Sequence, residues 1–384
     1  MQSLRLDART APAAAPARAA RRLGAIDVAK AIGIVLVVAG HAPDAPAALL
    51  APIYSVHMPL CFFLSGSVLS AERAALPWRT STQRAARTLL VPYLFFFLLS
   101  FGYWLLTRHL GARAAKFAGV DTADAWSGLA TGLSADLFVN ITLWFLPCLF
   151  VCQLLHSAAL RAFGRAFGRV VGHESGPGAV LLLAAGLATA LLAFTLPWSA
   201  RLPWGLDIAW IALPFYAAGH WLRAARAWPG RSVARGTWHA PMAGAAVAVA
   251  TGLAWLALVF VQGRVDLALA DFGPYPLLYL PCAAAGIALV MMLAQRCPST
   301  RLLRWLAGNS LVIFALHPLL INAVSGALQM SGGKALAAEQ PMLWWLAGTA
   351  WGIAACVPIA ALLRRHVPFV LGQAPASRLQ RGSA

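Results

Sequence analysis

Charged side chains are scarce in this sequence. Asp, Glu, Lys and Arg make up only 11% of its 384 residues, while 60% of the residues are hydrophobic. A soluble domain carries about 25% charged residues, so this composition excludes an ordinary soluble fold. Apolar runs recur along the chain and are long enough to cross a hydrocarbon core of about 30 Å. The sequence therefore predicts an all-α, polytopic integral membrane protein.

Cysteines and metal-binding motifs are also few. The six cysteines follow no spacing typical of zinc or redox sites, so neither a disulfide nor a bound metal is expected. The sequence contains no HExxH motif and no paired carboxylates for metal-assisted hydrolysis. Ser65, in "FFLSGS", lacks the preceding glycine of a nucleophile elbow. Both absences argue against a hydrolase.

Acidic residues number 12 against 30 Lys and Arg, which gives a formal net charge of +18. About ten spans are predicted, near residues 25–42, 54–70, 88–106, 136–155, 179–196, 206–221, 241–261, 275–294, 309–324 and 342–363. With loops on alternating sides, 23 basic residues fall on one side and 6 on the other, and Lys30 alone lies inside a span. Positive loops remain cytoplasmic, so both termini are expected in the cytoplasm. The protein itself is expected in the cell inner (plasma) membrane. The basic excess then faces anionic lipid, and no nucleic-acid partner is expected.

The chain divides into three expected parts. Residues 1–22 are rich in Ala, Pro and Arg and are expected to form a disordered, basic cytoplasmic N-terminus. Residues 23–366 form one membrane domain, and residues 367–384 form a cytoplasmic tail.

Two of the predicted spans are weak. Span 206–221 contains Asp207 and Pro214, and span 309–324 is interrupted by His317 and a following proline. Broken helices are tolerated in a membrane only where neighbours or a cavity satisfy the backbone. Both spans are therefore expected to face the protein interior.

Ionisable residues inside spans are the main functional candidates, because such groups are costly at membrane depth. In "IDVAKAIGIVLVVAGH", Lys30 and His41 are eleven residues apart, so they share a helix face and lie roughly 16 Å apart along it. Asp27 precedes Lys30 by three residues, a spacing suited to an ion pair. His57 enters the next span after a short loop and is expected at the depth of His41. His317 lies in the ninth span, and an imidazole is the usual general base toward a hydroxyl.

Each of these residues also has a purely structural interpretation. Asp27 suits the positive end of a helix dipole, and Lys30 suits a side chain that extends to the membrane interface. His41 suits the outer interface, while His57 and His317 suit structural hydrogen bonding. The shared helix face of Lys30 and His41 favours a function for that pair.

Five segments carry a family resemblance. They are "IDVAKAIGIVLVVAGH", "IYSVHMPLCFFLSG", "RAARTLLVPYLFF", "LWFLPCLF" and "GNSLVIFALHPLL". In that order they resemble the landmarks of the membrane acyltransferase-3 family, and most closely its fucose 4-O-acetylase-like sugar O-acetyltransferase branch. The landmarks run from the first span to the ninth, so the resemblance covers essentially the whole membrane domain.

The resemblance implies a membrane-bound O-acyltransferase. It implies acyl-CoA, usually acetyl-CoA, as a cosubstrate with no tightly bound cofactor, and a carbohydrate hydroxyl as the acceptor. The family's first-span signature is a basic residue, ten further residues and a histidine, which maps onto Lys30 and His41. We expect Lys30, with Arg84 and Arg87, to attract the CoA phosphates and His41 to deprotonate the acceptor hydroxyl. His57 is expected to orient His41 or to bind the developing oxyanion.

Further residues are expected to line the substrate pocket. They are Asp27, Trp144, Asn309 and His317. A covalent acyl-histidine relay remains an alternative to direct transfer.

Two other functions are consistent with intramembrane charge. A carbohydrate or lipid transporter would use buried His and Lys side chains to relay protons, although the sequence shows no internal repeat. A non-catalytic partner of polysaccharide biosynthesis machinery is the third interpretation. Turnover of labelled acetyl-CoA separates the enzyme from both.

Overall fold

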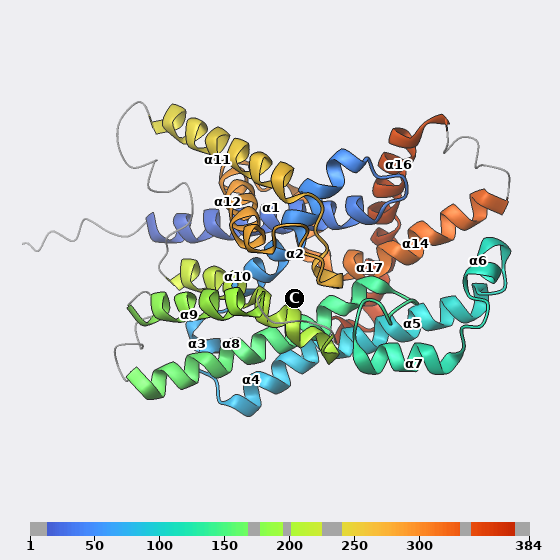
Figure 1. Cartoon of the computed structure of the whole chain (residues 1–384), viewed down its shortest axis with the longest axis horizontal. Coiled ribbons are helices and arrows are strands. Elements are labelled where there is room, and N and C mark those ends of the chain that lie inside the picture. The colour runs from blue at the N-terminus through green and yellow to red at the C-terminus, as the bar shows by residue number, and fades with distance from the viewer. Residues whose placement is uncertain (1–13, 168–176, 195–200, 225–239, 331–338, 373–384) are drawn as a thin grey trace, which may run out of the picture.

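The computed structural model describes residues 14–167, 177–194, 201–224, 240–330 and 339–372. Within these ranges the regular structure is helical, apart from one isolated antiparallel bridge between Asp266 and Asp271. The predicted all-α fold is confirmed. The helices form one elongated bundle, in which α1, α5 and α8 run along its long axis (Figure 1).

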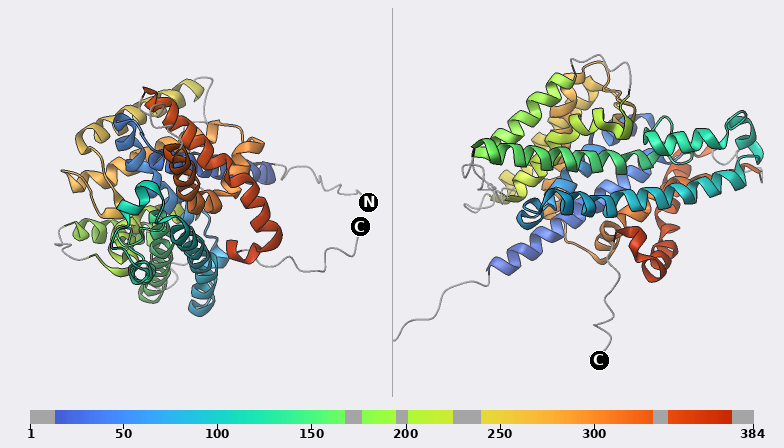
Figure 2. Two further views of the ribbon diagram at one scale, coloured as in Figure 1. Left: turned by 90° about the vertical axis from the view of Figure 1, so that its right-hand side faces the viewer. Right: turned by 90° about the horizontal axis from the view of Figure 1, so that it is seen from below.

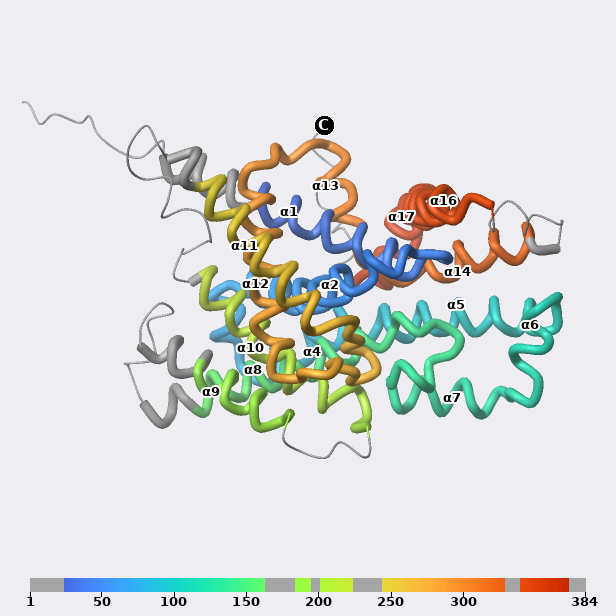
Figure 3. Tube along the Cα trace, turned by 45° about the horizontal axis from the view of Figure 1, so that its top comes forward, coloured from blue at the N-terminus to red at the C-terminus, as the bar shows by residue number. Residues whose placement is uncertain are grey.

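The longer helices account for most of the bundle. They are α1 (Ala14–His41), α2 (Ala47–Ser67), α5 (Val91–Thr107), α8 (Phe145–Phe167), α9 (Pro177–Ala193), α10 (Leu206–Ala224), α11 (Ala240–Gln262), α12 (Tyr279–Arg296), α14 (Ser310–Met330), α16 (Pro341–Ala354) and α17 (Cys356–His366). The shorter helices are α3 (Ala71–Ala74), α4 (Trp78–Ala85), α6 (Gly111–Lys116), α7 (Thr122–Thr131) and α13 (Arg301–Gly308). From α5, the chain passes through α6 and returns along α7 as a hairpin that projects from one end (Figure 3).

Eight segments of the described residues are long and apolar enough to cross a membrane. They are Gly24–His41, Ala47–Ser67, Trp78–Thr107, Ile141–Ala162, Gly244–Gln262, Pro276–Arg296, Ser310–Leu328 and Pro341–His366. The two other predicted spans coincide with α9 and α10, which are helices outside this set. The chain is therefore a polytopic helical membrane protein, and the number ten stays a prediction.

Helix boundaries differ from those expected. The first helix begins at Ala14, so residues 14–22 are helical rather than part of a disordered tail, while residues 1–13 lie outside the described residues. Alanine and arginine are strong helix formers, and a proline in a first turn does not break a helix. At the other end, Pro368–Leu371 form a 3-10 turn inside the predicted tail, and residues 373–384 lie outside the described residues.

The third span is longer than expected and contains an irregular turn. Helix α4, a π-helical turn at Ala86–Leu90 and α5 run on as the segment Trp78–Thr107. Several of the membrane-crossing segments carry exposed apolar side chains, which are suited to contact lipid. Examples on α5, α11 and α16 are Leu94, Leu98, Leu106, Leu253, Phe260 and Leu343. In the end-on view, α16 and α17 lie on the outside of the bundle (Figure 2).

The two weak spans face the interior, as predicted. Ile208 and Ala212 of α10 are 0% exposed, and so are Ile313 and Ala315 of α14. Helix α10 packs on α2, α8 and α9, whereas α14 packs on α1 and α16.

Glycines bring α2 and α10 into backbone contact. A Cβ on Gly66 would lie only 1.9 Å from the carbonyl oxygen of Tyr216, and a Cβ on Gly219 only 2.0 Å from that of Phe63. Small residues allow helices in a membrane to approach closely, where packing rather than the hydrophobic effect holds them together. Gly66 ends the "IYSVHMPLCFFLSG" segment, so this landmark residue has a packing role.

Candidate active site

Three histidines from three helices meet at the C-terminal end of α1. The ring centroid of His41 lies 5.3 Å from that of His317 on α14 and 6.4 Å from that of His57 on α2. Both pairs are edge-on, with interplanar angles of 72° and 79°. The rings of His41 and His57 lie close together on adjacent helices, and the ring of His317 lies still closer to that of His41. That His41 and His57 share one depth in the membrane stays a prediction.

All three rings are held in the same way. Nδ1 of each histidine lies 2.8 to 2.9 Å from the main-chain carbonyl oxygen four residues earlier. Because a carbonyl only accepts, Nδ1 carries the proton, and Nε2 of a neutral ring keeps its lone pair. With this tautomer a neutral His57 offers Nε2 as an acceptor, and its expected roles of orienting His41 or binding the oxyanion stay predictions. Each ring presents a hydrogen-bond acceptor and potential base.

The three rings differ in access. His41 is partly exposed, while His57 is 3% exposed and His317 is 0% exposed. Within the described residues, Nε2 of His317 is buried and has no hydrogen-bond partner. A buried imidazole nitrogen without a partner is costly, so this nitrogen is suited to a bound hydroxyl.

Residues that the sequence analysis missed complete this end of the site. The ring of Tyr54 lies 4.9 Å from that of His57 and 6.3 Å from that of His41. The guanidinium of Arg264 stacks over Tyr54, 4.7 Å from its centroid. Both Arg264 and Asp266 lie within electrostatic range of His41. The loop after α11 therefore covers the histidine cluster with one cation and one carboxylate.

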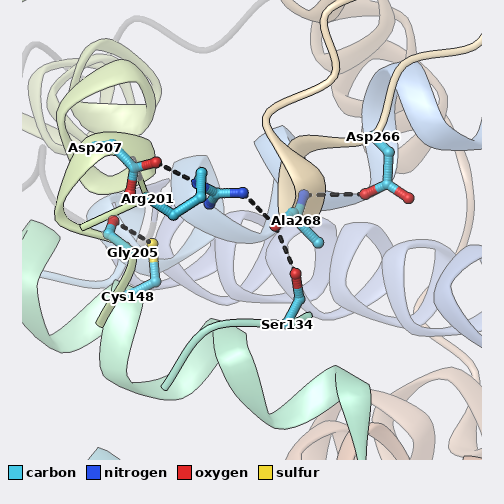
Figure 4. Close-up of polar contacts among 7 residues, drawn as sticks. All are labelled: Ser134, Cys148, Arg201, Gly205, Asp207, Asp266 and Ala268. Atoms are coloured by element: carbon cyan, nitrogen blue, oxygen red, sulfur yellow. Dashed lines mark hydrogen bonds and ion pairs between the residues drawn. The ribbon is translucent and has the colours of Figure 1, made fainter. Parts of the chain in front are cut away.

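Hydrogen bonds from two other segments fix this loop in place (Figure 4). The carbonyl of Ala268 accepts a hydrogen bond from the hydroxyl of Ser134 at 2.6 Å and one from the guanidinium of Arg201 at 3.1 Å. Arg201 also pairs with Asp207, which is only 2% exposed at the start of α10. One carboxylate oxygen of Asp266 accepts from the amide of Ala268 at 3.0 Å, which orients the side chain. Burial raises the pKa of Asp266 above its ordinary value of 3.8.

The segment before α8 supports the helix that carries His317. Pro318 has no N–H, so the carbonyl of Phe314, four residues earlier, loses its helical partner. The hydroxyl of Thr142 donates to that carbonyl at 3.2 Å, and the side-chain amide of Asn140 donates to the carbonyl of Ala315 at 2.8 Å. The broken turn beside His317 is thus satisfied by protein groups.

Trp144, a predicted pocket residue, lies next to this support. It is 6% exposed and packs against the ring of Phe145, which in turn contacts Phe62 and Phe314. Trp144 therefore adjoins a packed aromatic layer formed by side chains of α2, α8 and α14.

Lys30 lies near the middle of α1, in the first half of the membrane segment Gly24–His41. It is partly exposed, and Asp27 interacts with it electrostatically. These two described residues form no ion pair within 4.0 Å. The prediction that Asp27 and Lys30 form an ion pair in direct contact is therefore wrong. Between Lys30 and His41, Ile34 is 5% and Val37 is 0% exposed. The face that the two residues share therefore points into the protein and not into lipid.

The remaining predicted residues lie apart from the histidines. Arg84 on α4 and Arg87 in the π-helical turn are exposed. Asn309, between α13 and α14, is 2% exposed, and its amide donates to the carbonyl of Trp305 at 2.7 Å. Its side-chain oxygen is buried and has no partner among the described residues. Asn309 precedes His317 by eight residues, or about 12 Å of helix.

Comparison with known proteins gives one match. A family model described as an acyltransferase domain matches residues 23–361, which include the three histidines, Lys30 and the loop after α11. A search of curated proteins and a search of solved structures gave no match. Within the described residues, no group of three or more His, Cys, Asp or Glu side chains is arranged to hold a metal ion.

Proposed function

The chain belongs to the membrane acyltransferase-3 family and is a membrane acyltransferase; on that premise we propose that it moves an acetyl or another short acyl group from acyl-CoA to a hydroxyl of a carbohydrate. The proposal includes the fucose 4-O-acetylase-like branch of the family and the inner membrane as its location. Suitable acceptors are exopolysaccharide, O-antigen or lipid-linked sugar units, supplied by polysaccharide biosynthesis machinery.

The observation that carries this proposal is the cluster of three histidine rings, each with Nδ1 bound to a carbonyl of its own helix. His41 is the accessible ring of the three, and its Nδ1 proton is engaged by the carbonyl of Val37. In the proposed step, Nε2 of His41 takes the proton of the acceptor hydroxyl while the hydroxyl oxygen attacks the thioester carbonyl. The C–S bond then breaks and the CoA thiolate leaves. His41 gives the proton that it took from the hydroxyl to this thiolate. The products are an ester and CoA with a free thiol.

The neighbouring rings are suited to hold the acceptor. Neutral His57 and His317 offer lone pairs that accept hydrogen bonds from carbohydrate hydroxyls. Asp266 adds a carboxylate acceptor on the same side of the cluster, and Tyr54 adds an aromatic ring. Since the Nδ1–H of each neutral histidine is already donated to a carbonyl, we assign the stabilisation of the oxyanion to the guanidinium of Arg264.

The donor enters from the opposite end in this proposal. CoA is cytoplasmic and polyanionic, and Lys30 supplies an ammonium roughly 16 Å down α1 from His41. Arg84 and Arg87 are exposed and supply further positive charge for the CoA phosphates. The flexible pantetheine arm then passes along the inward face of α1, which requires the side chains near Val37 to move aside.

Replacing His41 with alanine tests the proposal. Loss of a general base costs about 10²–10⁴-fold in rate, so H41A should lose acyl transfer by at least two orders of magnitude. The measurement is release of CoA thiol from acetyl-CoA by purified protein in detergent, with isolated surface glycan as the acceptor. The matched control is H109A, because His109 is an exposed histidine outside the cluster. More than about a tenth of wild-type activity in H41A would remove His41 as the base.

The acceptor class is tested in cells. A strain that lacks the protein should lose O-acetyl groups from one surface glycan, and the wild-type chain but not H41A should restore them. Unchanged O-acetylation in the deletion strain, with active purified enzyme, would reject the carbohydrate acceptor and leave the acyltransferase activity intact.

A further inference from the structure

A second histidine pair lies outside the site described above. Nε2 of His156 on α8 lies 3.0 Å from Nδ1 of His220 on α10. The two residues are 1% and 8% exposed, and the proposed acyl transfer uses neither of them. Within the described residues, Nε2 of His220 is buried and has no hydrogen-bond partner. Two buried imidazoles that pair with each other, one of them with a nitrogen left without a partner, suggest a ligand site.

A cavity adjoins this pair. It has a volume of about 190 Å³ and lies between α8, α9 and α10, which run side by side in the bundle (Figure 1). His156 forms part of its wall, together with Gly186, Thr189, Trp210, Leu213 and Ala217. None of the described residues that line it is charged. An apolar cavity of this size stays free of water and is suited to a hydrocarbon.

The size and walls of the cavity restrict its occupant. Pockets for drug-sized ligands measure about 300–1,000 Å³, so neither CoA nor an oligosaccharide fits in 190 Å³. An anion would find no compensating charge among the lining residues. On the outer side, Trp210 is 40% exposed, and the neighbouring residues Leu187 and Leu192 of α9 are 42% and 63% exposed. These apolar surfaces place the entrance on the side that faces lipid.

The histidine pair defines the polar group of the ligand. If Nε2–H of His156 donates to Nδ1 of His220, then Nδ1 of His156 is left as an acceptor. If Nδ1–H of His220 donates instead, Nδ1 of His156 is left as a donor. A hydroxyl both donates and accepts, so it matches both arrangements, whereas a carbonyl or an amine proton matches only one.

We propose that the cavity between α8, α9 and α10 binds part of one hydrocarbon chain of an uncharged, hydroxyl-bearing amphiphile from the bilayer, with its hydroxyl bonded to His156. The site is separate from acyl transfer and does not depend on the function proposed above. His220 acts as a positioning residue, because its hydrogen bond holds the ring of His156.

The experiment uses the full chain in phosphatidylcholine vesicles with a photoreactive probe. The probe is a monoacylglycerol with a diazirine in its chain, and a diazirine-bearing alkane of equal length serves as the hydroxyl-free comparison. After illumination, mass spectrometry of the digested protein locates the labelled residues. The monoacylglycerol should label residues around the cavity on α9 and α10 in preference to other lipid-facing helices, and unlabelled monoacylglycerol should compete.

Two variants test the cavity itself. Gly186→Leu should fill it and reduce labelling there about tenfold, because a Cβ at Gly186 meets nothing closer than 4.0 Å and the side chain can enter the space. The matched control is Gly252→Leu on α11, where a Cβ would also make only ordinary contacts, at 3.7 and 3.8 Å. His156→Phe should keep the ring and remove the hydrogen bond, which lowers the preference for the hydroxyl probe over the alkane about fivefold.

Three outcomes would overturn the proposal. The first is wild-type labelling spread evenly over all lipid-facing helices. The second is equal labelling of the cavity in Gly186→Leu and Gly252→Leu. The third is an alkane that labels the cavity as strongly as the monoacylglycerol in the wild type. Because the first and third outcomes are measured on the wild-type chain, they hold even where a variant is unstable.

Discussion

Replacing Gly66 with alanine should force α2 and α10 apart. An added Cβ would lie 1.9 Å from the carbonyl oxygen of Tyr216, whereas ordinary contact begins at 3.4 Å, so the helices must separate locally by about 1.5 Å (3.4 minus 1.9). The obstacle is main chain, and no change of rotamer relieves it. Overpacking of this kind costs about 1–3 kcal/mol. Because α2 also carries His57, the displacement should lower activity as well as stability.

Gly102→Ala is the matched control for that variant. Gly102 lies inside α5, and a Cβ there would meet nothing within 4 Å. Alanine is the better helix former by about 1 kcal/mol, so this variant should be at least as stable as the wild type. The assay is thermal unfolding of purified protein in one detergent, with Gly219→Ala as the reciprocal test on α10. If Gly66→Ala unfolds at the same temperature as Gly102→Ala, the close backbone contact is not present.

Three further changes have defined outcomes. Lys30→Arg should raise the KM for acetyl-CoA less than Lys30→Ala does, because it keeps the charge; equal loss in both would reject phosphate attraction. Burial raises the pKa of Asp266 above 3.8, so its carboxylate is lost at a higher pH than that of an exposed aspartate. The KM for the acceptor should therefore rise as the pH falls, and a pH profile of D266N should lack this limb. Arg201→Leu leaves the buried Asp207 without its cation and should cost about 3–5 kcal/mol of stability, part of which D207N restores in the double variant; an R201L protein as stable as the wild type would contradict the buried pair.

Much of the fold was predictable because membrane insertion is a strong constraint. Long apolar runs indicate helices, and the broken spans around Pro214 and Pro318 indicate interior positions, which the burial of α10 and α14 confirms. Helix ends were less predictable, since apolar periodicity fades where a helix leaves the hydrocarbon. The span predicted to end at residue 155 continues as α8 to Phe167. His156 therefore fell just outside the predicted span, although it is 1% exposed.

The candidate site was also predictable only in part. His41 and His57 were predictable as neighbours because one short loop joins their helices, and the structure places their rings 6.4 Å apart. Arg264 and Asp266 were not, since the position of a loop over a distant helix depends on contacts with no sequence period. Here the position of the loop depends on Arg201 and on hydrogen bonds to one carbonyl group. Polar residues in a short loop between two spans were the only signal in the sequence.

The place of His41 in α1 favours it over its two neighbours as the group that takes up the proton. It is the last residue of the helix, where the carbonyl end of the helix dipole stabilises a cation by about 0.3–2 kcal/mol. His57 and His317 lie inside α2 and α14 and are 3% and 0% exposed, so an imidazolium there would lose its hydration without that compensation. A positive charge formed during acyl transfer is therefore most stable on His41. The two buried rings then stay neutral, and as neutral rings they can only accept hydrogen bonds at Nε2, which suits them to hold the hydroxyl groups of the acceptor.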